Sequence, residues 1–119
     1  LIRPSLYQAR HKIFALSGGE IFDECKKEQL KELKFSPCDV VGPICESGDF
    51  LAKDRNLPPL NPGDLVAIKS AGAYGFAMSS NYNTRGRVAE VAVKSGEDFL
   101  IRRRESFEDI VALEREFLG

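Results

Sequence analysis

The apolar residues of this chain fall into short runs that are bounded by glycine, proline and polar residues. Residues 12–16 form one such run and lead into a Ser-Gly-Gly sequence, and residues 40–41 stop at a Gly-Pro pair. A third run, residues 65–68, follows a Pro-Gly-Asp turn. Because strand interiors disfavour glycine and proline, these breaks mark the ends and starts of predicted strands.

The last third of the chain has a different pattern. Residues 87–93 alternate between apolar and polar, residues 94–97 have the composition of a turn, and residues 98–103 alternate again, which predicts an antiparallel hairpin. Ser106 and Asp109 have the spacing of a capping box at the start of a final helix. The apolar stripe of that helix would consist of Phe107, Ile110, Leu113 and Phe117.

The segments between these elements are less regular. Residues 20–34 alternate in charge and are interpreted as a surface insertion, part loop and part helix, without an assigned function. Residues 49–54 are compatible with a turn or short helix, and residues 57–64, rich in proline, form a connector. Several short strands with one hairpin and a terminal helix predict a mostly β barrel or sandwich with short helices.

Composition and charge narrow the class of protein. The 119 residues suit one domain, residues 1–119, and 43% hydrophobic residues can fill its core. A net charge of −1 gives no reason to expect binding to nucleic acid or to an anionic membrane. No apolar run approaches the roughly 18 to 20 residues of a membrane helix. The chain begins at Leu1 without a methionine, so we expect it to be a fragment.

The cysteines point to a reducing compartment. Cys25, Cys38 and Cys45 cannot form a closed set of disulfides, and none lies in a Cys-x-x-Cys pair that would suggest zinc. We therefore expect a cytoplasmic protein without a metal site. His11 is the one histidine, and a single histidine cannot build a Ser-His-Asp triad or a multi-histidine metal site from this chain alone; we interpret it as a packed or half-exposed histidine.

Two segments carry candidate chemistry. A helical turn would place Arg3 and Tyr7 on one face, where a planar guanidinium and a phenol could hold a carboxylate, although an exposed arginine beside a tyrosine is usually only a solvated surface. Tyr74 stands between small residues that would let a ligand approach the backbone closely. Close packing of a short helix on a sheet is the alternative for that segment.

A third candidate follows the Gly-Pro break, where Cys45 and Glu46 are succeeded by a flexible Ser-Gly pair and Asp49. The run from Cys45 to Asp49 closely resembles the Cys-Glu-Ser-Gly-Asp signature in the C-terminal domain of diaminopimelate decarboxylases. Residues 3–7 resemble that family's Arg-Pro-x-Leu-Tyr segment, and residues 71–76 with 79–83 resemble its tyrosine motif. One departure is Arg10, where the family usually has tyrosine.

The resemblance implies a fold and an assembly. This chain would be the C-terminal, Greek-key-like β-barrel of a fold-type III decarboxylase that depends on pyridoxal phosphate. A preceding (β/α)8 barrel, absent from this chain, would carry the Schiff-base lysine and the glycine-rich phosphate site, so the fragment alone is expected to be inactive. The family forms head-to-tail homodimers in which this domain lends its Cys-Glu motif to the partner's active site.

The resemblance also implies a reaction and a role for each candidate residue. The reaction is decarboxylation of meso-diaminopimelate to L-lysine. Cys45 would be catalytic, near the reacting carbon and involved in reprotonation, and Glu46 would bind the distal ammonium of the substrate. Arg3 and Tyr7 would hold the distal carboxylate. Tyr74 would contact the cofactor phosphate and the substrate.

Two alternatives remain open at this point. An ornithine or arginine decarboxylase has the same fold, but its substrate lacks the distal carboxylate, so Arg3 and Tyr7 with the Glu46-Ser-Gly sequence favour diaminopimelate. A non-catalytic assembly or regulatory module that kept the barrel would also lack a lysine for the cofactor.

Overall fold

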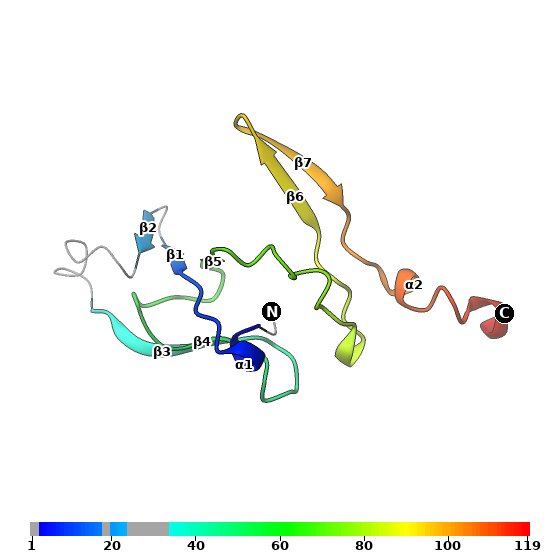
Figure 1. Ribbon diagram of the computed structural model, residues 1–119, viewed down its shortest axis with the longest axis horizontal. Coiled ribbons are helices and arrows are strands. Elements are labelled where there is room, and N and C mark those ends of the chain that lie inside the picture. Colours follow the sequence, from blue (N-terminus) through cyan, green and yellow to red (C-terminus); the bar gives the residue numbers. More distant parts are fainter. Residues whose placement is uncertain (1–2, 18–19, 24–33) are drawn as a thin grey trace. The chain divides into compact units, whose positions relative to one another are not determined.

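The computed structural model describes residues 3–17, 20–23 and 34–119 and divides the chain into two compact units, Leu1–Met78 and Ser79–Gly119. Among the described residues, the first unit contains the short helix α1 (Arg3–Tyr7) and five strands, and the second contains two strands and several short helical turns (Figure 1).

A three-stranded antiparallel sheet of order β2-β1-β5 forms one part of the first unit. The predicted strand at residues 12–16 is present as β1 (Ile13–Ser17), and the run after the Pro-Gly-Asp turn is β5 (Leu65–Ile68). The edge strand β2 (Glu20–Asp23) corrects the interpretation of its residues as loop or helix. Its backbone pairs with β1, which directs these residues into the sheet. The rest of the predicted insertion, residues 24–33, lies outside the described residues.

A two-stranded sheet joins β3 (Ser36–Val41) to β4 (Phe50–Leu57) in antiparallel register. The strand end predicted at the Gly-Pro pair is confirmed, because β3 stops at residue 41. The prediction of a turn or short helix at residues 49–54 is wrong, since most of this segment belongs to β4. Pairing with β3 and burial of Ala52 and Leu57 outweigh the polar character of the local sequence.

The core of the first unit is small. It centres on Ile13, which is fully buried, and on Ala52 and Leu57. Cys38, Val40 and Ile68 pack against these residues, so both sheets of this unit contribute to one core. Among the described residues, two polar side chains are buried in this unit: His11, which precedes β1, and Arg55, which lies within β4.

The second unit is built on the predicted hairpin, formed by β6 (Glu90–Lys94) and β7 (Glu97–Arg102). Ser95 and Gly96 make a two-residue connection, and both have positive φ, 55° and 82°, as the tight hairpin turn requires. The short 3-10 helix η2 (Tyr82–Thr84) precedes the hairpin. A short helix was the alternative for residues 70–83; the structure has a turn at residues 73–78 and the single helical turn η2.

The predicted capping box at Ser106 and Asp109 is present in full at the start of α2 (Phe107–Ile110). The prediction of a single terminal helix is wrong, because the helical conformation ends after α2 and returns only in α3 (Arg115–Leu118). Phe107, Leu113 and Phe117 of the expected stripe are exposed. A short helix owes most of its stability to a buried apolar face, and this stripe is not buried.

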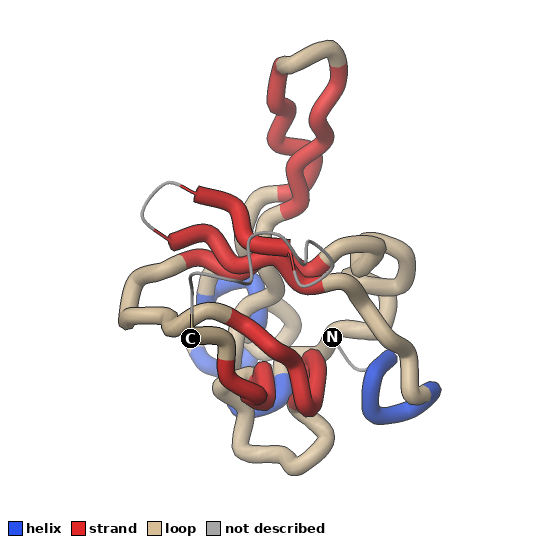
Figure 2. Tube along the Cα trace, turned by 90° about the vertical axis from the view of Figure 1, so that its left-hand side faces the viewer, coloured by secondary structure: helices blue, strands red, loops and turns tan. Residues whose placement is uncertain are grey.

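The mostly β class is confirmed. The described strands form three separate open sheets and not a closed barrel, as the topology and Figure 2, with its strands in red, both show. Among the described residues, none of the helices has the length and apolar character that crossing a membrane would need.

Candidate active site

Helix α1 places Arg3, a predicted site residue, beside Tyr74 of the tyrosine motif. Arg3 and Tyr7 begin and end this one-turn helix, and Pro4 is buried within it. The guanidinium carbon of Arg3 lies 5.6 Å from the centroid of the Tyr74 ring, within the range of a cation–π interaction. Tyr7 is 64% exposed. Residues that are distant in sequence, Arg3 and Tyr74, are therefore neighbours in the fold.

The backbone of Tyr74 adopts an unusual conformation, with φ of 62°. Hydrogen bonds from Gly75 N to Gly72 O (3.0 Å) and from Met78 N to Tyr74 O (3.0 Å) hold this turn. A Cβ at position 75 would lie 2.8 Å from the Ala71 carbonyl oxygen, so glycine is needed there. Positive φ is uncommon for a residue as large as tyrosine, although Thr84 and Ser95, which lie outside this site, share it. Tyr74 is nevertheless 62% exposed, as a ligand contact would require.

The signature loop, which we define as residues 42–49, is closed by Asp49. Gly42 N donates to the Asp49 carbonyl oxygen (2.8 Å), and Ile44 N donates to Asp49 Oδ2 (2.9 Å). A Cβ on Gly42 would lie 2.0 Å from the same carboxylate oxygen. The aspartate of the Cys-Glu-Ser-Gly-Asp sequence thus shapes the loop, a role that the sequence did not suggest.

Cys45 and Glu46 lie exposed in this loop. The Glu46 carboxylate accepts hydrogen bonds from the Gly48 backbone N–H and from Ser47 Oγ, the latter at 3.4 Å. These donors turn the carboxylate back over its own loop and fix its direction. An exposed carboxylate held in this way can bind a cation without first being ordered.

The signature loop lies beside α1. A Cβ on Gly48 would be 2.6 Å from Glu46 Oε2 and 3.4 Å from Ser5 Oγ. Gly48 therefore lies between the Glu46 carboxylate and helix α1, where there is no space for a side chain. Helix α1 also contacts β4, which follows the loop. Ser5 is a residue of this region that sequence reasoning missed, because its proximity depends on the tertiary fold.

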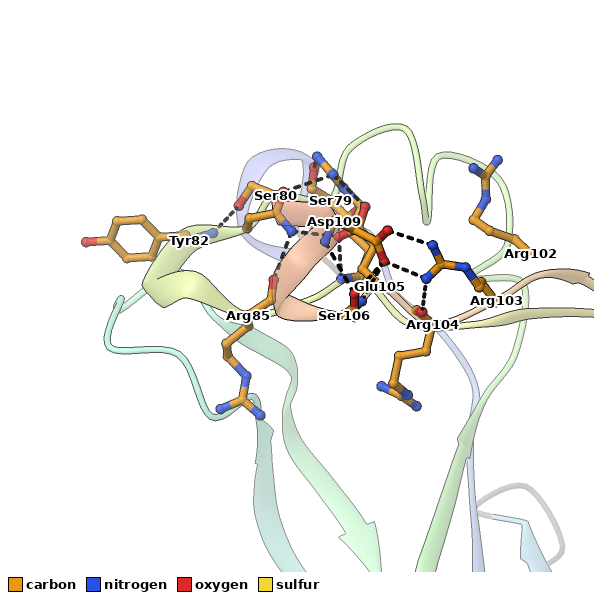
Figure 3. Close-up of polar contacts among 12 residues, drawn as sticks. Ser79, Ser80, Tyr82, Arg85, Arg102, Arg103, Arg104, Glu105, Ser106 and Asp109 are labelled. Carbon is orange, nitrogen blue, oxygen red and sulfur yellow. Dashed lines mark hydrogen bonds and ion pairs between the residues drawn. The ribbon is translucent and has the colours of Figure 1, made fainter. Parts of the chain in front are cut away.

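Residues 79–83, the second half of the tyrosine motif, belong to the second unit and join a polar network there (Figure 3). Arg87 donates to Ser79 Oγ (3.0 Å), Asn81 Oδ1 (3.0 Å) and Glu105 Oε1 (3.1 Å). The pKa of Glu105 lies below its ordinary value, because the Arg87 backbone N–H and the Asn81 amide both donate to the carboxylate. This network ties Ser79 and Asn81 to Arg87, which precedes β6, and to Glu105, which follows β7. We assign it a structural role.

Arg102, Arg103 and Arg104 form a basic run at the end of the hairpin, and all three are exposed. Arg102 Nε lies 2.6 Å from Glu90 Oε2. Arg103 makes a bidentate contact with Asp109 at 2.5 and 2.6 Å, visible in Figure 3, and this contact holds the pKa of Asp109 well below its usual range.

The packed interpretation of His11 is confirmed, since the residue is 4% exposed. Within residues 3–17, 20–23 and 34–119, His, Cys, Asp and Glu do not gather into any cluster of three or more that could hold a metal ion.

Comparisons with known proteins place these motifs in a family. The family model described as "Pyridoxal-dependent decarboxylase, C-terminal sheet domain" matches residues 1–72. A diaminopimelate decarboxylase of Campylobacter jejuni is 54% identical over 119 residues, which cover 99% of this chain and 26% of that protein. One of Aquifex aeolicus is 50% identical over 111 residues, 93% of this chain and 24% of that protein.

A solved structure gives the same result. The crystal structure of diaminopimelate decarboxylase from Helicobacter pylori complexed with L-lysine superposes with a TM-score of 0.79 at 43% identity, covering 97% of this chain and 25% of that one. The chain therefore spans about a quarter of the length of the relatives it matches. By its sequence and its fold, the chain belongs to the pyridoxal-dependent decarboxylases, in the part of these enzymes that forms the C-terminal sheet domain.

Proposed function

We propose that this chain is the C-terminal domain of a diaminopimelate decarboxylase, which removes one carboxylate of meso-diaminopimelate as carbon dioxide and yields L-lysine. The names of the similar proteins support this substrate, and one of the similar structures holds L-lysine, the expected product. Such an enzyme catalyses one step of lysine synthesis, and we propose that it acts in the cytoplasm.

The observation that carries the proposal is the convergence of separate motifs within the first unit. Arg3 contacts the ring of Tyr74, and Ser5 of the same helix lies beside Gly48 of the signature loop. A cation and a phenol from segments far apart in sequence are thereby brought together, and the exposed loop holds an ordered carboxylate that a neighbouring subunit can reach. These are the groups that a substrate with a distal carboxylate and a distal ammonium needs.

Each group has a distinct role in this proposal. The Arg3 guanidinium offers a planar fork of donors to the distal carboxylate, and Tyr7, four residues later, offers a phenolic donor. Glu46 binds the distal ammonium through charge. Cys45, beside it in the loop, holds a proton that can be delivered to the carbon from which the carboxylate departs.

The chemistry of the residues around Tyr74 suits contact with the phosphate of a cofactor. The exposed phenol is a hydrogen-bond donor, the Arg3 cation lies next to it, and the neighbouring residues are small. Tyr74, which also contacts the substrate in this proposal, would hold the phosphate of pyridoxal phosphate. When bound, this cofactor withdraws the electrons left by the departing carboxylate.

We further propose a head-to-tail homodimer in which the signature loop completes the partner's active site. The exposure of Cys45 and Glu46 at the end of a hairpin supports this arrangement, because the loop can reach another subunit.

The proposal is tested by expressing the full-length enzyme with pyridoxal phosphate and measuring carbon dioxide and L-lysine released from meso-diaminopimelate. L-ornithine and L-arginine serve as competing substrates without a distal carboxylate. Preference for diaminopimelate supports the proposal. Faster turnover of ornithine or arginine would assign the chain to the other decarboxylases of this fold, and no turnover of any substrate would favour the assembly module.

A further inference from the structure

His11 is a buried residue to which the proposed reaction assigns no role. Its Nδ1 lies 3.1 Å from the carbonyl oxygen of Lys69, and its side chain is almost fully enclosed. A carbonyl oxygen can only accept a hydrogen bond, so Nδ1 must carry the proton. In the neutral ring Nε2 is then a bare acceptor, and it is buried without a hydrogen-bond partner among the described residues. The contact with Lys69 therefore selects one tautomer.

The backbone around His11 is tied to the same neighbours. Lys69 N donates to the carbonyl oxygen of Lys12 at 2.9 Å, which gives a second bond between the two segments. The Arg55 guanidinium, 4% exposed, donates through Nη2 to the His11 carbonyl oxygen at 2.9 Å. Three segments of the first unit thus meet at one buried position.

Each of these segments leads to a different part of the candidate active site. His11 closely follows α1, which carries Arg3. Lys69 directly follows β5 and precedes the turn that presents Tyr74. Arg55 lies on β4, which begins directly after the signature loop. Displacement at this junction would change the separation of the site groups without removing any of them.

We propose that His11, as the Nδ1-protonated tautomer, is a positioning residue that sets Arg3 against Tyr74, with Arg55 fixing β4 to the same point. This inference rests on the proposed function, because it assigns His11 to the distance between the carboxylate-binding and cofactor-binding ends of one site. His11 itself contacts neither substrate nor cofactor.

Two substitutions in the full-length enzyme separate positioning from packing. In His11→Asn the side-chain amide N–H takes the place of Nδ1–H, whereas in His11→Gln it takes the place of Nε2. Glutamine is closer to histidine in size, so a packing role predicts that His11→Gln is the milder change. Positioning predicts the reverse order.

We expect His11→Gln to lower kcat/KM for meso-diaminopimelate about ten-fold, chiefly by raising KM, which corresponds to the loss of one buried hydrogen bond. His11→Asn should stay within about two-fold of wild type on the same scale. Hydrogen exchange followed by mass spectrometry should show faster exchange at Lys69 and in the Tyr74 turn for His11→Gln only. Equal kinetics and equal exchange in the two variants, or a milder His11→Gln, would overturn the inference.

Neutron diffraction from wild-type crystals keeps the inference falsifiable if His11→Gln does not fold. Deuterium on Nδ1 supports it, and deuterium on Nε2 alone refutes it. If wild type does not decarboxylate diaminopimelate, the proposed function fails, while the exchange and neutron results still decide whether the His11 junction exists.

Discussion

Replacement of Arg3 by lysine tests the carboxylate clamp most directly. The change keeps a cation near Tyr74 but removes the planar fork of donors. At 5.6 Å from the ring centroid, the interaction with Tyr74 is worth about 0.5 to 1 kcal/mol at an exposed site, and a lysine retains part of it. The larger loss is paired hydrogen bonding to the distal carboxylate, about 1.5 to 3 kcal/mol for a bond to a charged group.

This loss converts to a fall in kcat/KM of about 10- to 150-fold, since each 1.4 kcal/mol is about ten-fold. The assay is the initial rate of carbon dioxide release from meso-diaminopimelate by the full-length enzyme. Arg10→Lys is a matched control, because Arg10 is exposed and lies just beyond the same helix. If Arg3→Lys keeps the wild-type kcat/KM, or if Arg10→Lys loses as much, Arg3 does not bind the substrate carboxylate.

Three further outcomes are expected. Glu46→Gln, which keeps shape but removes charge, should raise KM for diaminopimelate and lower kcat in the same assay; a change in neither would exclude an ammonium contact. Cys45→Ala should lower kcat more than it raises KM, and mixing it with a variant that lacks the cofactor-binding lysine should restore part of the activity; heterodimers without activity would exclude a shared site. Because the folded pKa of Glu105 is lowered, its contribution to stability is complete above the unfolded pKa and is lost as pH falls through the folded one. The melting temperature should therefore fall less steeply with acid in Glu105→Gln than in wild type or in the control Glu114→Gln, and parallel curves would contradict this.

Elements set by local chemistry could be predicted from the sequence. The hairpin follows from a Ser-Gly turn between alternating segments, and the capping box follows from the spacing of Ser106 and Asp109. Strand β4 was missed because its Lys-Asp-Arg-Asn stretch is polar, and only pairing with β3 makes it a strand. The terminal helix was overextended because a stripe of apolar residues predicts a buried face that this unit does not provide.

In the candidate site, too, local features could be predicted and tertiary contacts could not. Residue identities such as Cys45, Glu46 and Tyr74 could be taken from motifs, because a motif is local. The contact of Arg3 with Tyr74 could not, since it depends on how α1 and the turn after β5 meet. The burial of Arg55 was equally unpredictable, because an arginine in a polar stretch is ordinarily exposed.

The signature loop also has a consequence for how this sequence can vary. The Asp49 carboxylate occupies the space that a side chain on Gly42 would need, and the same carboxylate holds Ile44 N. Positions 42 and 49 are therefore sterically coupled: we expect a larger residue at 42 to be tolerated only with a shorter one at 49, which would free the loop backbone. Because Asp49 belongs to the signature, we expect substitutions at either position to be rare among diaminopimelate decarboxylases, and a larger residue at 42 to occur only together with a shorter one at 49.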